Sequence, residues 1–254
     1  LGLRLALITA AFVDMGIGLF LLRREAQNRP QLMRTAFAAL GVLLATSLSM
    51  TVVQFDPLKM ASGVFRTGST ILSDDAQLIF YRDGKTASVS VTQYADARRL
   101  IATNGKTDAA INIHGKPASD EPTMALLAAL PLAMHASPEE IGVIGFGSGM
   151  STHTLLGDSR VKRVDTIEIE PAMIEGARAF GSKVERAYTD PRSNIVIDDA
   201  KAYFSGQQAR YDIIVSEPSN PWISGVGTLF SKEFYEFIPR HLKPGGLFVQ
   251  WVQL

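Results

Sequence analysis

Acidic residues follow short apolar runs at three places in the second half of the chain. The acids are Glu168, Asp198, Asp199 and Glu217. Short apolar runs bounded by turn residues are typical of buried strands. In an open α/β sheet, ligands bind at the carboxyl ends of the strands. Carboxylates placed there can accept hydrogen bonds from sugar hydroxyls, pair with cationic amines or accept a proton.

A glycine-rich turn precedes the first of these acids by about twenty residues. It follows the apolar run 141–144 and consists of Gly145, Gly147, Ser148 and Gly149. Glycines allow a tight turn that brings the backbone close to a ligand at the start of a helix. An acid at the position of Glu168 binds a ribose diol in dinucleotide-binding folds. The pair predicts a nucleoside cofactor, although Met150 stands where the dinucleotide fingerprint has glycine or alanine.

The adjacent acids at 198 and 199 are candidates for reading adenine. A carboxylate at the end of a strand can accept a hydrogen bond from the adenine amino group. Successive side chains point to different sides, so we expect Asp199 rather than Asp198 to make this contact. The alternative is a pair of solvated turn acids that cap a helix over 201–204. Glu170 has a similar alternative, as an acid that complements a helix dipole.

The most distinctive motif follows the apolar run 211–215. It reads Ser216-Glu217-Pro218-Ser219-Asn220-Pro221-Trp222 and combines a carboxylate, an amide, prolines and an indole. Proline stiffens the backbone, and Trp222 offers a flat apolar wall. We expect a ligand-binding loop here, and the alternative is a proline-rich turn after a strand.

The composition excludes several classes of partner and site. Lys and Arg total 25 and Asp and Glu total 25, so a nucleic-acid partner has no electrostatic support. The chain has no cysteine, which excludes disulfides, thiolate metal sites and a cysteine nucleophile. The histidines lack metal-ligand spacing, and we predict no metal site.

The apolar pattern changes along the chain. From 141 onward, short apolar strands alternate with helices, which is typical of a doubly wound parallel α/β sheet. From 76 to 113, alternating residues with turns at Asp83-Gly84 and Asn104-Gly105 predict a small antiparallel β-domain. A helix is expected over Leu126–His135, bent or ended near Pro131.

The first 53 residues hold two long apolar stretches, 5–22 and 37–53. Each approaches the roughly 20 residues that cross a bilayer, so we expect two transmembrane helices. The alternatives are core helices of a soluble protein and a cleaved signal peptide. The arginine-rich segment between them predicts a cytoplasmic loop. We expect three regions, 1–55, 56–122 and 123–254, and a longer protein with helices upstream and a further helix and hairpin downstream.

Taken in order, the motifs resemble the spermidine synthase family of polyamine aminopropyltransferases, in its bacterial membrane-fused form. The matching residues are Leu130-Pro131-Leu132, the glycine turn, Glu168-Ile169-Glu170, Asp198-Asp199-Ala200, the motif around Glu217, 228–235 and 242–246. The resemblance implies a small β-domain followed by a methyltransferase-like Rossmann domain. It also implies transfer of an aminopropyl group from decarboxylated S-adenosylmethionine to an amine, with release of methylthioadenosine. We expect a multi-pass protein located in the bacterial inner membrane.

The resemblance assigns a role to each candidate residue. The glycine turn, Glu168 for ribose, and Asp198, Asp199 and Ala200 for adenine are expected to bind the donor. Glu217 occupies the position of the family's catalytic acid, and Asn220 is expected to be a second catalytic residue. The expected substrate contacts are Glu217, Trp222, Asp120 and Thr123. The expected partners are a small amine and the membrane, and a homodimer is left open.

Three positions depart from the family pattern. Ser148 and Asn220 stand where the family has aspartates, and Thr123-Met124 stands where it has Tyr-Gln. A dicationic substrate should therefore bind less well. Two alternatives follow: an S-adenosylmethionine-dependent methyltransferase, because Asn220-Pro221-Trp222 resembles an amino-methyltransferase motif, and a non-catalytic nucleoside-binding domain of a membrane protein. The arginine-rich loop places the domain outside the cell, but the donor is cytoplasmic, and we expect the cytoplasmic face.

Overall fold

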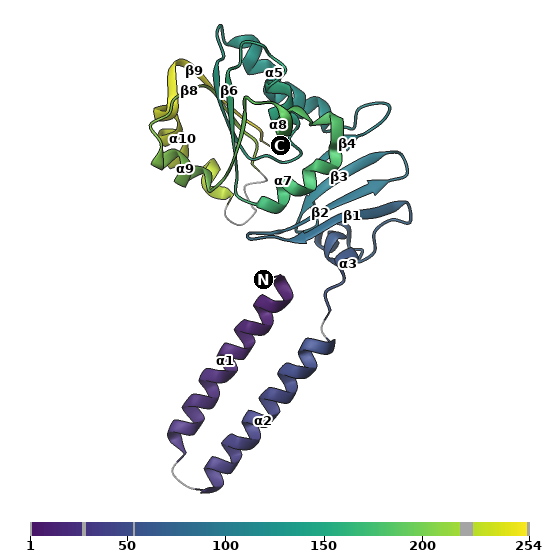
Figure 1. Ribbon diagram of the computed structural model, residues 1–254, viewed down its shortest axis with the longest axis vertical. Coiled ribbons are helices and arrows are strands. Elements are labelled where there is room, and N and C mark those ends of the chain that lie inside the picture. The colour runs from purple at the N-terminus through teal and green to yellow at the C-terminus, as the bar shows by residue number, and fades with distance from the viewer. Residues whose placement is uncertain (1, 27–28, 53, 219–225, 253–254) are drawn as a thin grey trace. The chain divides into compact units, whose positions relative to one another are not determined.

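The computed structural model describes residues 2–26, 29–52, 54–218 and 226–252 (Figure 1). The chain divides into two compact units, Leu1–Lys59 and Met60–Leu254. Both sheets lie within the second unit, and the further division at 122 and 123 stays a prediction.

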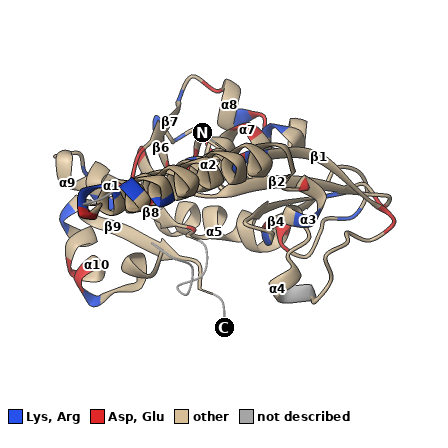
Figure 2. Ribbon diagram, turned by 90° about the horizontal axis from the view of Figure 1, so that it is seen from below, with Lys and Arg blue, Asp and Glu red and all other residues tan. Residues whose placement is uncertain are grey.

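The first unit is a pair of long helices, α1 (Leu3–Glu25) and α2 (Arg29–Val52). Both are long and apolar enough to cross a membrane, by length and composition. Their leucine and phenylalanine side chains are largely exposed, and Figure 2 shows both helices mostly in tan, with few charged residues. The predicted pair of apolar helices is confirmed: α1 extends beyond the expected 5–22 at both ends, and α2 begins at Arg29, before the expected 37, and ends at Val52.

A small antiparallel sheet opens the second unit, after the short helices α3 (Pro57–Ala61) and α4 (Val64–Thr67). Its strands pair in chain order and are β1 (Ala76–Asp83), β2 (Ser88–Tyr94), β3 (Arg98–Thr103) and β4 (Lys106–Asn112). The β3–β4 turn places Asn104 and Gly105 at positive φ, which suits these residues. The predicted antiparallel sheet is confirmed.

The second sheet is parallel and has the order β7-β6-β5-β8-β9. Its strands are β5 (Glu140–Ile144), β6 (Arg163–Glu168), β7 (Ser193–Ile197), β8 (Tyr211–Ser216) and β9 (Leu242–Gln250). The chain moves outward from β5 to β7 and then returns to the other side of β5. This reversal creates a switch point at the carboxyl end of β5, where ligands bind in open α/β sheets.

Helices cover both faces of the parallel sheet, as the doubly wound prediction requires (Figure 1). They are α5 (Glu121–Met134), α6 (Met150–Leu155), α7 (Pro171–Ala177), α8 (Arg186–Thr189), α9 (Ala200–Gly206) and α10 (Lys232–Phe237), with 3₁₀ turns η1 (Arg178–Lys183), η2 (Gly227–Phe230) and η3 (Ile238–His241). One apolar cluster joins α5 and α6 to one face. Another joins α9, α10 and η3 to the other face.

Two element boundaries differ from the sequence-based expectation. Helix α5 begins at Glu121, before the predicted Leu126, and continues past Pro131 to Met134. Proline removes one backbone donor, and burial of one face of the helix outweighs that loss. Strand β9 begins at Leu242, before the apolar run 247–252 that indicates a strand in the sequence, because Leu242 pairs with Tyr211 before an irregular step in the ladder.

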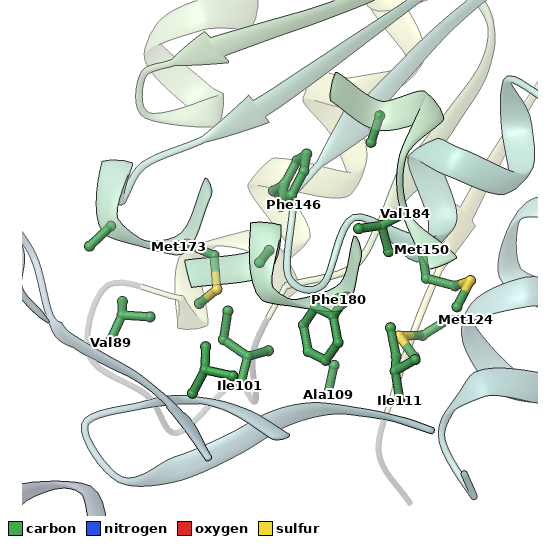
Figure 3. Packing of buried hydrophobic residues seen from close by; sticks show 14 residues of the cluster. Val89, Ile101, Ala109, Ile111, Met124, Phe146, Met150, Met173, Phe180 and Val184 are labelled. Atoms are coloured by element: carbon green, nitrogen blue, oxygen red, sulfur yellow. The ribbon is translucent and has the colours of Figure 1, made fainter. Parts of the chain in front are cut away.

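A third cluster packs the small sheet against α7 and η1 (Figure 3). Ile101 and Ile111 from the small sheet face Phe180, which is fully buried. Gly176 on α7 lies so close to the sheet that an added Cβ would be 3.1 Å from the ring of Phe80. The small sheet is thereby fixed beside the carboxyl end of β6.

Glu170 also ties the small sheet to the parallel sheet. Its Oε2 accepts hydrogen bonds from Thr86 N at 2.7 Å, Thr86 Oγ1 at 2.9 Å and Ala87 N at 3.2 Å. Its Oε1 accepts one from Ala172 N at 2.9 Å and so caps α7. Burial raises the pKa of Glu170, but these hydrogen bonds outweigh it and the pKa is lowered. The helix-start role foreseen for this acid is therefore confirmed.

Replacing Glu170 with alanine is expected to destabilise the fold by about 2–3 kcal/mol, because buried N–H groups lose their acceptor. The matched control is Glu175→Ala, since Glu175 is exposed on α7 and pairs with Arg82 on the surface. That variant should change stability by less than about 1 kcal/mol. Denaturant unfolding of the whole chain measures both, and equal effects would contradict the role given to Glu170.

Candidate functional site

The glycine turn after β5, residues 145–149, forms what we call the Gly loop. Gly145, Gly147 and Gly149 all have positive φ, between 51° and 90°. A Cβ on Gly145 would lie 2.7 Å from the backbone oxygen of Glu217, so a side chain does not fit there. Glu217 N donates to Ile144 O at 2.9 Å. These contacts hold the Gly loop against the residue that follows β8.

Glu168 links the end of β6 to the Gly loop. Its Oε2 accepts a hydrogen bond from Phe146 N at 2.9 Å, and its Oε1 accepts one from Glu170 N at 2.9 Å. The residue is 7 % exposed, and burial raises its pKa against these hydrogen bonds. A carboxylate oxygen has more than one lone pair, so both oxygens can still accept from sugar hydroxyls.

The acids after β7 are exposed, and each accepts a hydrogen bond from a nearby backbone N–H group. Asp199 Oδ1 accepts from Ala202 N at 2.9 Å and caps α9, which is the helix-capping alternative considered for it. Asp198 Oδ1 accepts from Asp199 N at 2.8 Å. Ala200, the first residue of α9, is buried. Both carboxylates keep accepting capacity for an outside donor.

Two exposed isoleucines lie next to the acids at the ends of β6 and β7, and the sequence analysis did not single them out. Ile169 directly follows Glu168 and is 47 % exposed, and Ile197 directly precedes Asp198 and is 48 % exposed. They belong to the apolar segments 164–169 and 195–197, whose pattern is typical of buried strands. Their position at the ends of adjacent strands offers apolar surface to a planar ring.

Glu217 lies at the carboxyl end of β8 and is half-buried. Ser151 Oγ on α6 donates a hydrogen bond to its Oε2 at 2.6 Å. Burial raises the pKa of Glu217 to about 7, with the Ser151 hydroxyl acting in the opposite direction. The sequence analysis did not name Ser151 as a candidate site residue. The signal that could have found it is a polar residue on the buried side of the helix that follows the Gly loop.

Ser148 is turned inward, toward α5. It is 2 % exposed, and its Oγ donates to Met124 Sδ at 3.2 Å and accepts from Met150 N at 3.3 Å. Figure 3 shows Met124 and Met150 side by side. Two of the positions that depart from the family pattern, 148 and 124, are therefore in direct contact.

The other predicted substrate contacts divide into three cases. Asp120 Oδ2 accepts from Ala110 N at 3.1 Å and joins α5 to β4. Thr123 is exposed on the first turn of α5. Asn220 and Trp222 lie outside the described residues. Among the residues that the structure describes, no group of three or more acidic or histidine side chains is arranged to hold a metal.

Comparisons with known proteins give a consistent assignment. Residues 122–253 match the family described as the spermine/spermidine synthase domain. Spermidine synthase 2 of Arabidopsis thaliana is 33% identical over 119 residues, which cover 46% of this chain and 35% of that protein. Putrescine N-methyltransferase 2 of Nicotiana tabacum is 29% identical over 127 residues, or 50% of this chain and 36% of that protein. The chain thus spans little more than a third of these relatives.

A solved structure shares the fold. It is a spermidine synthase in complex with the transition state analogue AdoDATO, with a TM-score of 0.61 and 24% sequence identity. The match covers 68% of this chain and 57% of that one. At this identity the likeness concerns the arrangement of the two sheets and their helices.

Proposed function

Because the chain belongs to the spermine/spermidine synthase domain family, we propose that it transfers an aminopropyl group from decarboxylated S-adenosylmethionine to an amine. The observation that carries this proposal is the placement of Glu217. Its carboxyl group, with a pKa raised to about 7, lies beside the Gly loop at the carboxyl end of β8. A carboxylate there can hold a cationic amine and take its proton.

The chemistry requires a positioned amine more than a covalent intermediate. The acceptor ammonium passes one proton to Glu217, and the freed nitrogen attacks the carbon next to the sulfonium. The C–N bond forms while the C–S bond breaks, and its electron pair stays on sulfur, giving neutral methylthioadenosine. The new secondary nitrogen keeps one positive charge, in addition to the ammonium that the aminopropyl group brings with it, and Glu217 returns its proton to water. Holding the reactants in line supplies much of the rate.

The pH dependence of transfer should follow Glu217. The carboxylate form accepts the proton, so below its pKa of about 7 the rate should fall about tenfold per pH unit. Above that pH the rate should level off. Measuring kcat with saturating donor between about pH 5 and 9 checks this, and a profile that is flat through 7 would contradict it.

The nucleoside half of the proposed site consists of Glu168, the Gly loop and the acids after β7. Glu168 would accept from the ribose hydroxyls, as its buried, backbone-bonded carboxylate is already fixed in place. Ile169 and Ile197 would contact the faces of the adenine ring, and Asp199 its amino group. The family resemblance and the exposure of both isoleucines support this arrangement.

Asp199→Ala is expected to weaken methylthioadenosine binding by roughly tenfold, because the adenine amino group loses a charged acceptor. Asp198→Ala is the matched control, since both acids are exposed and bonded to local backbone. It should change the affinity less than about twofold. Calorimetry on the whole chain measures both, and a larger effect at Asp198 would move the adenine contact to that residue.

Methyl transfer from S-adenosylmethionine is the second candidate function. Two observations favour it. The chain is similar to a putrescine N-methyltransferase. Ser148, which contacts Met124 beside the Gly loop, carries no charge, and this suits a donor that keeps its carboxylate. Calorimetry with both donors separates the candidates. Tighter binding of the decarboxylated donor supports aminopropyl transfer, and tighter binding of the intact donor supports methyl transfer. Binding without turnover over a panel of amines supports a non-catalytic nucleoside-binding domain.

We also propose that α1 and α2 anchor the chain in a bacterial inner membrane, with the second unit on the cytoplasmic face. The length and apolar composition of both helices support the anchor. The cytoplasmic face is favoured because the donor is made in the cytoplasm. The arginine-rich loop between the two helices argues for the opposite face, since loops rich in arginine tend to be cytoplasmic. Protease treatment of intact cells decides the side, because external protease would cut the second unit only if it lay outside.

A further inference from the structure

Exposed apolar side chains gather near the start of the second unit, and we call residues 64–71 the α4 patch. Val64 and Phe65 lie on α4, and Ile71 follows in the loop before β1. All three side chains are exposed, Phe65 by 66 % and Ile71 by 74 %. Single exposed apolar residues are ordinary on a protein surface, whereas a group of them marks a surface that contacts a lipid or another protein.

The backbone of the α4 patch is fixed to the small sheet. Gly63, which precedes α4, has a φ of 64°, and a Cβ added to it would lie 2.2 Å from the backbone oxygen of Gly105 in the β3–β4 turn. At the other end of the patch, Ser69 Oγ accepts a hydrogen bond from Ile71 N at 3.2 Å. The apolar side chains are therefore presented by an ordered part of the second unit.

The chain connects the α4 patch to the proposed membrane anchor. Residues 53–63 lead from the end of α2 to α4 and include the helix α3. A connection of this length, partly helical, can span at most roughly 30 Å. With α2 in a bilayer, the α4 patch is thus tethered within reach of the lipid headgroups.

The charges near the patch also suit a lipid surface. Between 57 and 73 the sequence contains two basic residues, Lys59 and Arg66, and no acidic residue. Apolar side chains with lysine or arginine close by are typical of segments that lie in the membrane interface, and anionic headgroups attract the basic residues. In a two-fold contact between two copies of the chain the same segment would face itself, and its like charges would repel.

We propose that the α4 patch docks on the bilayer that α1 and α2 span, with Phe65 and Ile71 at the boundary between headgroups and acyl chains. Because the patch is fixed to the small sheet, this docking sets the orientation of the second unit on the membrane surface. The inference rests on the proposed membrane anchor and is independent of the transfer reaction.

The chain has no cysteine, so a single introduced thiol can carry a fluorescent label at a chosen position. The whole chain is placed, one copy per disc, in nanodiscs of phosphatidylethanolamine and phosphatidylglycerol. A polarity-sensitive label at Ile71→Cys should shift its emission to shorter wavelength and be quenched by nitroxide-bearing lipids. Met134→Cys on α5 is the matched control, because Met134 is also 74 % exposed. Its label should stay in water and keep its intensity.

Three results would overturn the inference. The first is an unquenched label at Ile71→Cys with emission typical of water. The second is quenching of the Met134→Cys label that equals or exceeds that at Ile71→Cys. The third is an emission shift at Ile71→Cys that nitroxide lipids do not quench, which would show that protein covers the patch instead of lipid.

A matched pair of variants tests whether apolar insertion holds the patch on the lipid. Phe65→Asp and Phe65→Leu are each combined with the label at position 71. Phe65→Asp should reduce the quenching, because a carboxylate is costly to move out of water, and Phe65→Leu should keep it. Both should fold, since the side chain of Phe65 is exposed, and thermal melting checks this. Equal quenching in the two folded variants would contradict the role given to Phe65.

A label at Leu40→Cys, near the middle of α2, separates the docking from the anchor. Quenching at position 40 without quenching at position 71 leaves the anchor standing and overturns the docking. Quenching at position 71 without quenching at position 40 shows a chain that binds the bilayer through the α4 patch, so that the anchor fails and the docking stands.

Discussion

Glu217→Gln is expected to lower the rate of aminopropyl transfer by about 10²–10⁴-fold while leaving methylthioadenosine affinity within about twofold. Glutamine keeps the size of the side chain and can still accept from Ser151, so the packing around position 217 is kept. It cannot take a proton from the amine. The rate is measured as methylthioadenosine formed per unit time with saturating donor, and calorimetry measures the affinity for methylthioadenosine.

Ser151→Ala is the comparison variant for this effect. The Ser151 hydroxyl lowers the pKa of Glu217, so its removal should move the midpoint of the pH–rate profile upward without removing activity. If Glu217 supported the structure without accepting the proton, Ser151→Ala would lower the rate equally at every pH and leave the midpoint of the profile where it is in the parent. Full activity of Glu217→Gln would show that another group accepts the proton.

Glu168→Gln should raise the dissociation constant for methylthioadenosine by roughly 100-fold. The carboxylate accepts from Phe146 N and Glu170 N, and the amide of glutamine would direct N–H groups at one of these donors. The ribose hydroxyls would also lose a charged acceptor. Calorimetry measures the affinity, and thermal melting shows whether the Gly loop is destabilised as well.

Glu139→Gln provides the control for this second effect. Glu139 precedes β5 at the amino end of the sheet and pairs with Lys162 at 2.8 Å on the surface. Removing its charge should leave nucleoside affinity unchanged and stability within about 1 kcal/mol of the parent. An affinity of Glu168→Gln equal to that of the control would place the ribose elsewhere.

Local spacing was enough to predict the framework of the site. The Gly loop, Glu168 and the acids after β7 each follow an apolar run, and a parallel sheet brings the ends of such runs to one edge. The sequence therefore predicted the sheet type and placed Glu168 and Glu217 at its carboxyl edge. It also predicted the antiparallel sheet, because its turns carry Asp-Gly and Asn-Gly pairs.

The contacts between distant residues could not be predicted in this way. Ser151 and Glu217 are 66 positions apart, and Thr86 and Glu170 are 84 apart. Such pairs depend on how α6 and the small sheet pack, which no local pattern encodes. The contact between Ser148 and Met124 belongs to the same class. Read separately, both residues were departures from a family pattern, whereas together they form one buried, uncharged contact.

The most direct test of the central claim is the product pattern of the whole chain supplied with decarboxylated S-adenosylmethionine and an amine. Mass spectrometry should find methylthioadenosine and the aminopropylated amine in equal amounts, and neither should accumulate with Glu217→Gln. The claim would be contradicted if the decarboxylated donor gave no methylthioadenosine while intact S-adenosylmethionine gave a methylated amine and S-adenosylhomocysteine.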